Sequence, residues 1–163
     1  MAERARAGDT AAFTALVGQH WTRLVRLARS IVGDADAEDA VQEALISGWR
    51  KIGRLRDPQA VGTWLSRITF RRCLATARRR HSLVTLAEAA EPHFEPNPGA
   101  AVDVQRMLAA LAPRQRAVMH LTVIEGLSDT EIGATLRMRP ATVRAHRRRA
   151  RERLLRMGSG EKP

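Results

Sequence analysis

Residues 128–150, SDTEIGATLRMRPATVRAHRRRA, constrain the fold of this chain more than any other segment. SDTE is a capping box, in which the Ser128 hydroxyl can accept a hydrogen bond from the Glu131 amide while the Glu131 carboxylate accepts one from the Ser128 amide. Pro140 suits the first position of a second helix, because the N–H that proline lacks would be unpaired there. The segment therefore predicts a helix, a tight turn at RMR and a second helix.

The second of these helices is basic along both flanks of its apolar face. The apolar positions, which recur at helical spacing and should pack inward, are Val143, Ala150, Leu154 and Met157. Residues 137–151 contain no acidic residue, whereas solvated charged helices usually alternate charges to form ion pairs four residues apart. The second helix of such a pair can enter the major groove of DNA, with its N-terminal residues toward the base edges. We therefore expect this helix to bind duplex DNA.

Arg147 interrupts the apolar face between Val143 and Ala150. Its long side chain can extend past the core to solvent or to DNA. Two interpretations stay open, namely a tolerated defect in the core and a residue that reads or clamps DNA. Replacing Arg147 with Leu would stabilise the domain in the first case and weaken DNA binding in the second.

Positive charge is concentrated in two separate stretches. The 163-residue chain has a formal net charge of +11. Residues 64–81 contain six arginines and no acid, and residues 137–157 contain nine arginines and one acid, Glu152. These two stretches together are more positive than the whole chain, so the remaining residues are net acidic. Such focused charge predicts a polyanionic partner that is contacted in two places.

Helical periodicity predicts an all-α fold, and no stretch alternates like a strand. Asp9 or Thr10 can cap a first helix, and a second helix carries Asp36, Glu38 and Asp39 in its first turn, where the macrodipole favours acids. Residues 82–101 change character, with three prolines, three glutamates and no sustained apolar period. We therefore expect two small helical domains, with the helix-turn-helix in the second. The predicted parts are residues 1–81, a flexible linker at 82–101, residues 102–157 and a tail at 158–163.

The helix that begins near Val61 carries an arginine stripe. Arg67, Arg71 and Arg78 fall on one face, beside Trp64. Single-stranded nucleic acid is held by aromatic side chains that stack on bases and by arginines that contact phosphates. Trp64 could stack on a base in this way, or it could pack in the apolar core. Both interpretations stay open.

Four quoted segments together resemble a sigma-70-family factor of the small, two-domain, extracytoplasmic-function (ECF) type. GDTAAFTALVGQHWTRLVRLA is similar to the opening helix of that family, and DAEDAVQEAL to its segment that binds core polymerase. TWLSRITFRRCLATARRR is similar to the promoter-melting helix, and LSDTEIGATLRMRPATVRAHRRRAR to the helix-turn-helix that reads the minus-35 element. The resemblance implies that domain 1–81 is sigma region 2 and domain 102–157 is sigma region 4.

The resemblance also implies a role for each matching position. Glu38, Asp39, Gln42 and Glu43 would dock on core RNA polymerase, although the helix dipole alone also accounts for Glu38 and Asp39. The residues that would contact the minus-10 element are Trp64, Arg67, Arg71, Arg72, Arg78 and Arg79. The residues that would contact the minus-35 element are Arg139, Thr142, Arg144, Ala145, Arg147, Arg148 and Arg149. In many such factors an anti-sigma protein sits between the two domains, and one is a possible partner here.

This chain departs from the family pattern in both DNA-contacting segments. Arg71 and Ala75 stand where the promoter-melting helix commonly has Asn and Asp. Arg137 replaces a frequent Gly in the turn, and Arg139 replaces a frequent Ser cap at the start of the recognition helix. These changes leave the expected fold intact but make the minus-35 sequence unpredictable.

Three functions are compatible with a basic helical chain of this kind. The first is a promoter-specificity subunit of RNA polymerase, and the second is a stand-alone helix-turn-helix regulator, which leaves the arginines of residues 64–81 and the segment DAEDAVQEAL unexplained. The third is an enzyme acting on nucleic acid. It would need a metal-binding carboxylate cluster, a glycine-rich cofactor loop or a nucleophile with its base, and none is recognisable, so we expect no enzymatic activity, metal or cofactor.

The remaining features predict a cytoplasmic protein without membrane insertion. Cys73 is the only cysteine, which excludes an internal disulfide and fits a reducing compartment. On a predicted helix it is expected to be packed rather than reactive. The N-terminal residues lack the apolar segment of a signal peptide, and no apolar run approaches the length of a membrane span.

Overall fold

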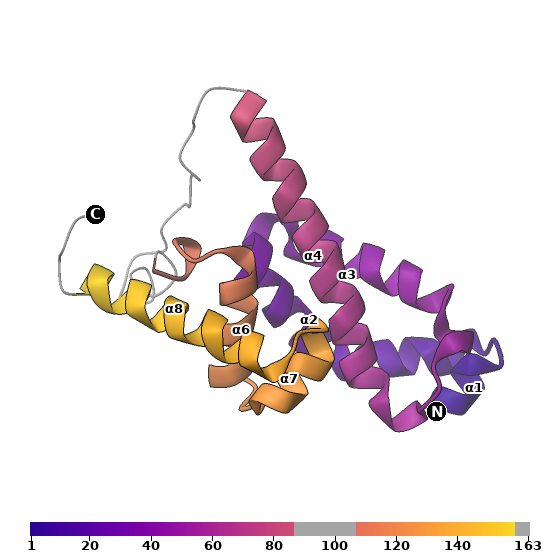
Figure 1. Ribbon diagram of the computed structural model, residues 1–163. Helices are drawn as coiled ribbons and strands as arrows, with labels where there is room; N and C mark the ends of the chain where they lie inside the picture. The colour runs from indigo at the N-terminus through magenta and orange to yellow at the C-terminus, as the bar shows by residue number, and fades with distance from the viewer. Residues whose placement is uncertain (87–106, 159–163) are drawn as a thin grey trace.

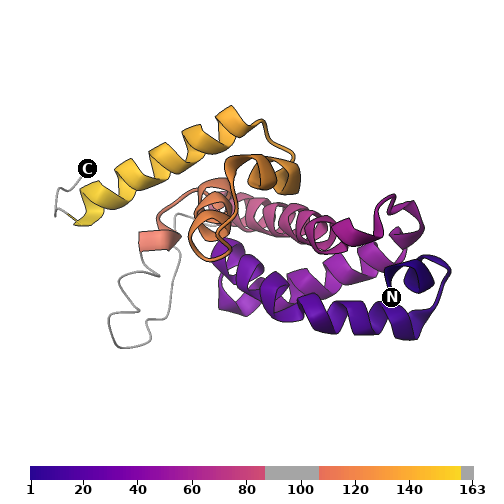
Figure 2. The same cartoon turned by 90° about the horizontal axis from the view of Figure 1, so that it is seen from below.

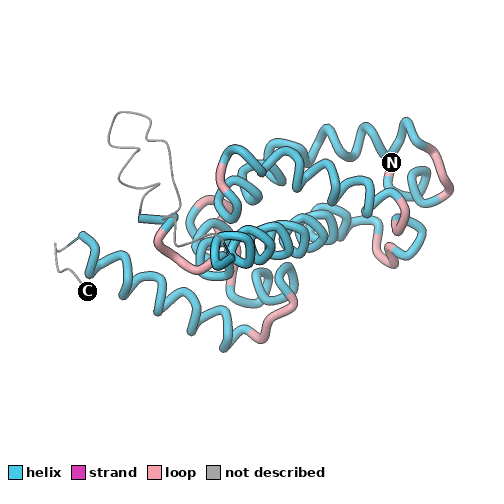
Figure 3. The backbone as a smooth tube through the Cα atoms, turned by 90° about the horizontal axis from the view of Figure 1, so that it is seen from above, coloured by secondary structure: helices cyan, strands magenta, loops and turns pink. Residues whose placement is uncertain are grey.

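Every element in the described residues, 1–86 and 107–158 of a computed structural model, is helical (Figures 1 and 3). The all-α prediction is thus confirmed. The α-helices are α1 (Ala2–Arg6), α2 (Thr10–Val32), α3 (Asp34–Trp49), α4 (Val61–Leu86), α6 (Pro113–Val123), α7 (Asp129–Leu136) and α8 (Pro140–Gly158), and the 3-10 helices are η1 (Ile52–Arg54) and η2 (Pro58–Ala60).

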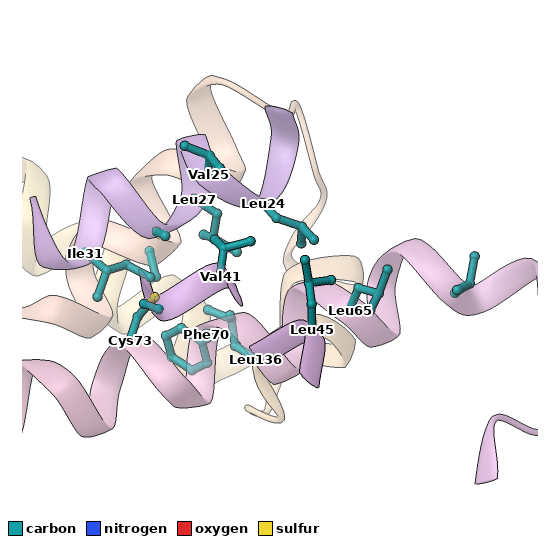
Figure 4. Packing of buried hydrophobic residues seen from close by; sticks show 14 of the residues in the cluster. Leu24, Val25, Leu27, Ile31, Val41, Leu45, Leu65, Phe70, Cys73 and Leu136 are labelled. Atoms are coloured by element: carbon teal, nitrogen blue, oxygen red, sulfur yellow. The ribbon is translucent and has the colours of Figure 1, made fainter. Parts of the chain in front are cut away.

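The first domain is a bundle in which α2, α3 and α4 pack against one another. Asp9 caps α2, since its Oδ1 accepts a hydrogen bond from the Ala12 amide at 2.9 Å. Leu24, Val41 and Leu65 belong to the apolar core between the three helices (Figure 4). This arrangement leaves the outer faces of α3 and α4 free to carry polar and charged side chains.

Helix α1 was not predicted from the sequence. Its segment, AERAR, offers no large apolar side chain, yet Ala2 and Ala5 are both buried. Because two alanines give no readable period, the packing of this short helix against α2 is visible only in the structure.

Helix α4 continues beyond the point where the linker was predicted to begin. It extends to Leu86, so residues 82–86 of the predicted linker are helical. The rest of that linker, 87–101, lies outside the described residues, as do residues 102–106 and the last residues of the predicted tail.

The second domain contains the predicted helix-turn-helix. Ser128 Oγ accepts a hydrogen bond from the Glu131 amide at 3.3 Å, and Glu131 Oε2 accepts one from the Ser128 amide at 2.8 Å, which confirms the capping box. Helix α7 ends at Leu136, and Pro140 opens α8 as predicted. Arg137 adopts a left-handed conformation, with φ of 55°, which costs a non-glycine residue about 1 kcal/mol.

The two domains are packed together. Helix α6 lies against α2, and α7 lies against α4, as the paths of these helices show in Figures 1 and 2. Leu136 of α7 belongs to the same buried cluster as Phe70 and Cys73 of α4 (Figure 4). One apolar core therefore continues from the first domain into the second.

Three partly or fully buried histidines are expected to make the stability of this fold depend on pH. Burial lowers the pKa of His20, His120 and His146 from the usual 6.5. Nearby arginines act in the same direction, and at His120 the carboxylate of Glu125 opposes the shift. The folded protein therefore favours neutral imidazoles, whereas the unfolded chain takes up protons near pH 6.5.

We expect the free energy of unfolding to be fully present above about pH 6.5 and to fall as the pH decreases through the lower pKa values of the folded state. Urea unfolding at about pH 7.5 and at about pH 5.5 measures this difference. Replacing His120 with Gln should reduce the loss. Equal stability at the two pH values would contradict the prediction.

Candidate nucleic-acid interface

A basic cavity of about 800 Å³ lies along the exposed side of α4. It is bounded by the end of α3, the loop that carries η1 and η2, and the first half of α4. Four of the predicted minus-10 residues line it, namely Trp64, Arg67, Arg71 and Arg72. A groove of this charge with an aromatic wall is suited to a single nucleic-acid strand.

Arg78 and Arg79 do not line this cavity. Both are exposed on α4, further toward its C-terminal end. They extend the basic surface along the helix rather than forming part of the cavity.

The loop before α4 contributes cations that the sequence prediction did not name individually. Lys51, Arg54 and Arg56 line the same cavity. The signal was present in the segment KIGRLR, where apolar and basic residues alternate. Ile52 and Leu55 are buried, so their packing turns the basic side chains outward.

Trp64 takes part in both of its proposed environments. It is partly buried against the core, and its ring lies 3.7 Å from the position that a Cβ on Gly48 would occupy. The remaining exposed part of the residue lines the basic cavity. The core therefore holds the ring in place at the wall of the cavity.

Arg67, which lines the cavity, also contacts the second domain. Its Nη2 donates a hydrogen bond to the backbone oxygen of Ala134 in α7, at 2.6 Å. Burial lowers the pKa of Arg67, and the positive charges of Arg137 and Arg71 lower it further. Arg137, from the turn after α7, also lines the cavity.

The polar residues predicted to bind polymerase lie together on the outer face of α3. Glu38, Asp39, Gln42 and Glu43 are all exposed. The sequence predicted a helix with Asp36 in its first turn, whereas α3 begins at Asp34. Gly33, with φ of 85°, separates α2 from α3, so the new helix starts directly after it. Glu38 and Asp39 therefore lie in the second turn, where the helix dipole acts weakly. The dipole accounts poorly for these acids.

Two of these acids have ion-pair partners within the domain. Glu38 Oε1 lies 3.5 Å from a guanidinium nitrogen of Arg29, and Glu43 Oε2 lies 3.2 Å from Nε of Arg72. Exposed ion pairs contribute little to stability. They can therefore be exchanged for contacts with a partner at low cost.

Helix α8 and the residue before it expose five of the predicted minus-35 residues, whereas Ala145 and Arg147 are partly buried. Arg139 and Thr142 are exposed at its N-terminal end, and Arg144, Arg148 and Arg149 along its length. A shallow hollow on this helix is lined by Arg144, Ala145 and Arg148. Val143 and Ala150 are completely buried, so the predicted apolar face holds the helix with its arginines outward.

Arg147 forms a bidentate ion pair with Asp129. Its two terminal nitrogens donate to the two carboxylate oxygens at 2.6 and 3.2 Å. The side chain of Arg147 is 31% exposed and that of Asp129 is 19% exposed. Arg147 is therefore not an unpaired defect in the core, because it ties the first residue of α7 to α8 across the turn.

We expect Arg147→Leu to lower the free energy of unfolding by about 1–2 kcal/mol, because it leaves the partly buried Asp129 without its bidentate partner. Urea unfolding measures the change. Arg148→Leu serves as the control, because Arg148 is 73% exposed and its ion pair with Glu152 is long, at 3.6 Å. A stability gain in the Arg147 variant would instead support the tolerated core defect.

The described residues offer no metal site, and their single cysteine is packed. No group of three or more potential ligands comes together in this part of the chain. Cys73 is buried, as predicted, and burial raises the pKa of its thiol to about 12. Among the described helices, none has both the length and the apolar character needed to cross a membrane.

Both halves of the chain match family models of known proteins. Residues 16–82 match the family model Sigma-70 region 2, and residues 101–154 match Sigma-70, region 4. The chain is 36% identical to the ECF RNA polymerase sigma factor SigM of Mycobacterium tuberculosis, over 93% of this chain and 79% of that protein. The chain belongs to the ECF sigma-70 family.

Another ECF relative is longer than this chain. The ECF RNA polymerase sigma factor SigE of Mycolicibacterium smegmatis is 38% identical over 90% of this chain, and the match covers 63% of that protein. The chain thus spans less than two thirds of the length of SigE.

Two solved structures share the fold of this ECF factor. CnrH, solved in complex with the cytosolic domain of CnrY, is 27% identical, with a TM-score of 0.72 over 99% of this chain and 96% of that chain. RpoE of Bartonella quintana, solved with the anti-sigma factor NepR, is 22% identical, with a TM-score of 0.75 over 93% of this chain and 99% of that one. The second likeness supports the fold alone.

Proposed function

We propose that this ECF-family chain is a promoter-specificity subunit, which binds core RNA polymerase and directs initiation at promoters with minus-10 and minus-35 elements. The observation that carries the proposal is the presence of two separate basic surfaces, the cavity along α4 and the outer face of α8. A stand-alone helix-turn-helix regulator would use only the second of them.

The α4 surface would hold the minus-10 strand. Trp64 would stack on a base while Arg67, Arg71 and Arg72 contact phosphates. Arg78 and Arg79 would follow the same strand further along the helix, and Lys51, Arg54 and Arg56 join this set because they line the cavity.

The α8 surface would occupy the major groove of the minus-35 duplex. Thr142, Arg144 and Ala145 lie in its first turns, where base edges are within reach. Arg139, Arg148 and Arg149 would contact phosphates or guanines. Arg147 would set the angle between α7 and α8 through Asp129.

The exposed face of α3 would dock on core polymerase through Glu38, Asp39, Gln42 and Glu43. The polymerase would perform the chemistry, so the chain itself would not be an enzyme. It would act in the cytoplasm, together with the polymerase. An anti-sigma protein is a further proposed partner, and the complex of CnrH with the cytosolic domain of a second protein, CnrY, supports it.

The test is in vitro transcription of sheared chromosomal DNA from the source organism by purified core polymerase, with RNA 5′ ends mapped by sequencing. We expect new start sites that need the protein and share two upstream motifs. Tight duplex binding without core-dependent start sites would support the stand-alone regulator instead. Release of nucleotides by the protein alone would point to an enzyme.

A further inference from the structure

Arg137 has an unfavourable backbone conformation at the edge of the cavity along α4. Its φ of 55° lies in the left-handed region, which glycine adopts freely and other residues adopt at a cost. The residue follows α7, and its exposed side chain lines the cavity, whose other lining residues all belong to the first domain. The turn between α7 and α8 therefore adds a positive charge from the second domain to a surface that is already positive.

The positive charge of this cavity is not balanced by acids. Among the described residues, Asp57 is the only acid that lines it, and Oδ1 of Asp57 already accepts a backbone hydrogen bond at 2.9 Å. Four arginines of the cavity have no ion-pair partner in the described part of the chain, namely Arg54, Arg56, Arg71 and Arg137. Like charges that are held together without a counter-charge cost free energy. A bound anion would remove this cost.

Arg67 is the residue on which these charges act together. Burial lowers the pKa of its guanidinium, and the positive charges of Arg137 and Arg71 lower it further. Arg71 belongs to α4, whereas Arg137 belongs to the second domain. An arginine stays charged at neutral pH, so the crowding is a cost of the folded state. The charges of both domains therefore converge on one place in the cavity.

The cavity also has the size and the aromatic wall of a small-molecule site. Its volume of about 800 Å³ lies within the range of roughly 300–1,000 Å³ that is usual for ligand pockets. Trp64, which packs against the core, offers a ring on which a base can stack. Guanidinium groups bind phosphate oxygens in a bidentate manner. Because a phosphate group carries a charge of about −1.5 to −2, the unpaired arginines match a chain of about two or three phosphates.

We propose that this cavity binds a small polyphosphate, free or carried by a nucleotide, and that Arg137 brings the second domain into the site. The ligand would contact Arg54, Arg56 and Arg71 from the first domain and Arg137 from the second. The proposal goes beyond promoter binding, because the ligand is a small molecule and because Arg137 has no part in the proposed minus-10 contacts. A polyphosphate and a DNA strand would exclude each other, since both would need Arg71.

Isothermal titration calorimetry of the full chain with inorganic triphosphate and with ATP tests the site. A magnesium-free buffer with about 150 mM salt screens contacts between exposed charges. Arg137→Gly removes the charge that the second domain contributes, and the left-handed backbone suits glycine, so the variant should keep its fold, which circular dichroism checks. Arg153→Ala is the matched control, because it removes the same charge from an exposed residue of α8 that does not line the cavity.

The wild-type chain should bind one triphosphate, and Arg137→Gly should bind it roughly tenfold or more weakly, since a charged hydrogen-bond partner is lost. Arg153→Ala should stay within about twofold of the wild type. Fluorescence anisotropy with a labelled oligothymidylate should give the same affinity for both variants. Tighter binding of ATP than of triphosphate, with the gain lost in Trp64→Leu, would identify a nucleotide as the ligand, and equal binding would identify a free polyphosphate.

Three results would overturn the proposal. The first is the absence of triphosphate binding by the wild-type chain. The second is an equal loss of triphosphate affinity in Arg137→Gly and Arg153→Ala, because binding would then follow net charge alone. The third is an equal loss of triphosphate and oligothymidylate affinity in Arg137→Gly, because Arg137 would then belong to the strand-binding surface. The triphosphate titration needs neither DNA nor polymerase, so this site and the proposed function can fail independently.

Discussion

Gly133→Ala is expected to lower the free energy of unfolding by about 2–3 kcal/mol. A Cβ at this position in α7 would lie 2.7 Å from the backbone oxygen of Met138. The turn between α7 and α8 cannot retreat without moving the first residues of α8, so overpacking here distorts the backbone rather than a side chain. Urea unfolding measures the loss, and duplex binding should fall with it.

Gly18→Ala is the matched control for this variant. Gly18 lies in the interior of α2, and a Cβ added there would meet no atom within 4 Å apart from its chain neighbours and the backbone of its own helix. Alanine is the better helix former by up to about 1 kcal/mol, so this change should stabilise the chain. If Gly133→Ala and Gly18→Ala were equally stable, the close contact between residue 133 and the backbone oxygen of Met138 would have no effect on the free energy of unfolding.

Replacing Asp39, Gln42 and Glu43 together with alanine is expected to weaken core polymerase binding by roughly tenfold or more, since removing even one strongly contributing interface side chain costs more than about 1 kcal/mol. All three side chains are exposed on α3, so stability should change little. Binding is measured with labelled core polymerase, and RNA yield with core polymerase on a template that responds to the wild-type chain.

The control for the triple variant replaces Glu3, Gln19 and Thr22 with alanine, because these residues are also exposed in the first domain but on α1 and α2. It should bind core polymerase like the wild type. Full transcription by the Asp39, Gln42 and Glu43 variant would remove α3 from the polymerase interface.

The local signals in the sequence predicted where the two helices of the helix-turn-helix begin. Ser128 and Glu131 cap α7, and Pro140 opens α8. These features could be predicted because each depends on residues that are no more than a few positions apart in the sequence. The same holds for Asp9 at the start of α2. Contacts within one helical turn are encoded by spacing, so reading the spacing recovers them.

Long-range contacts could not be predicted in this way. Arg67 donates a hydrogen bond to a backbone carbonyl in α7. Every residue has such a carbonyl, so the sequence does not show which one will be the acceptor. Arg147 meets Asp129 across a turn whose geometry depends on Gly133 and on the left-handed Arg137. The arginine stripe of α4 was therefore visible in the sequence, but its use as a cap for α7 was not.

The most direct test of the two basic surfaces compares mapped start sites for the wild-type chain and for an Arg148→Ala, Arg149→Ala variant, both with core polymerase on the same chromosomal DNA. We expect the start sites retained by the variant to keep their minus-10 motif while the minus-35 motif loses its information content, since α8 alone would read that element. Retention of both motifs, or loss of the minus-10 motif, would contradict the assignment of the two basic surfaces to two promoter elements.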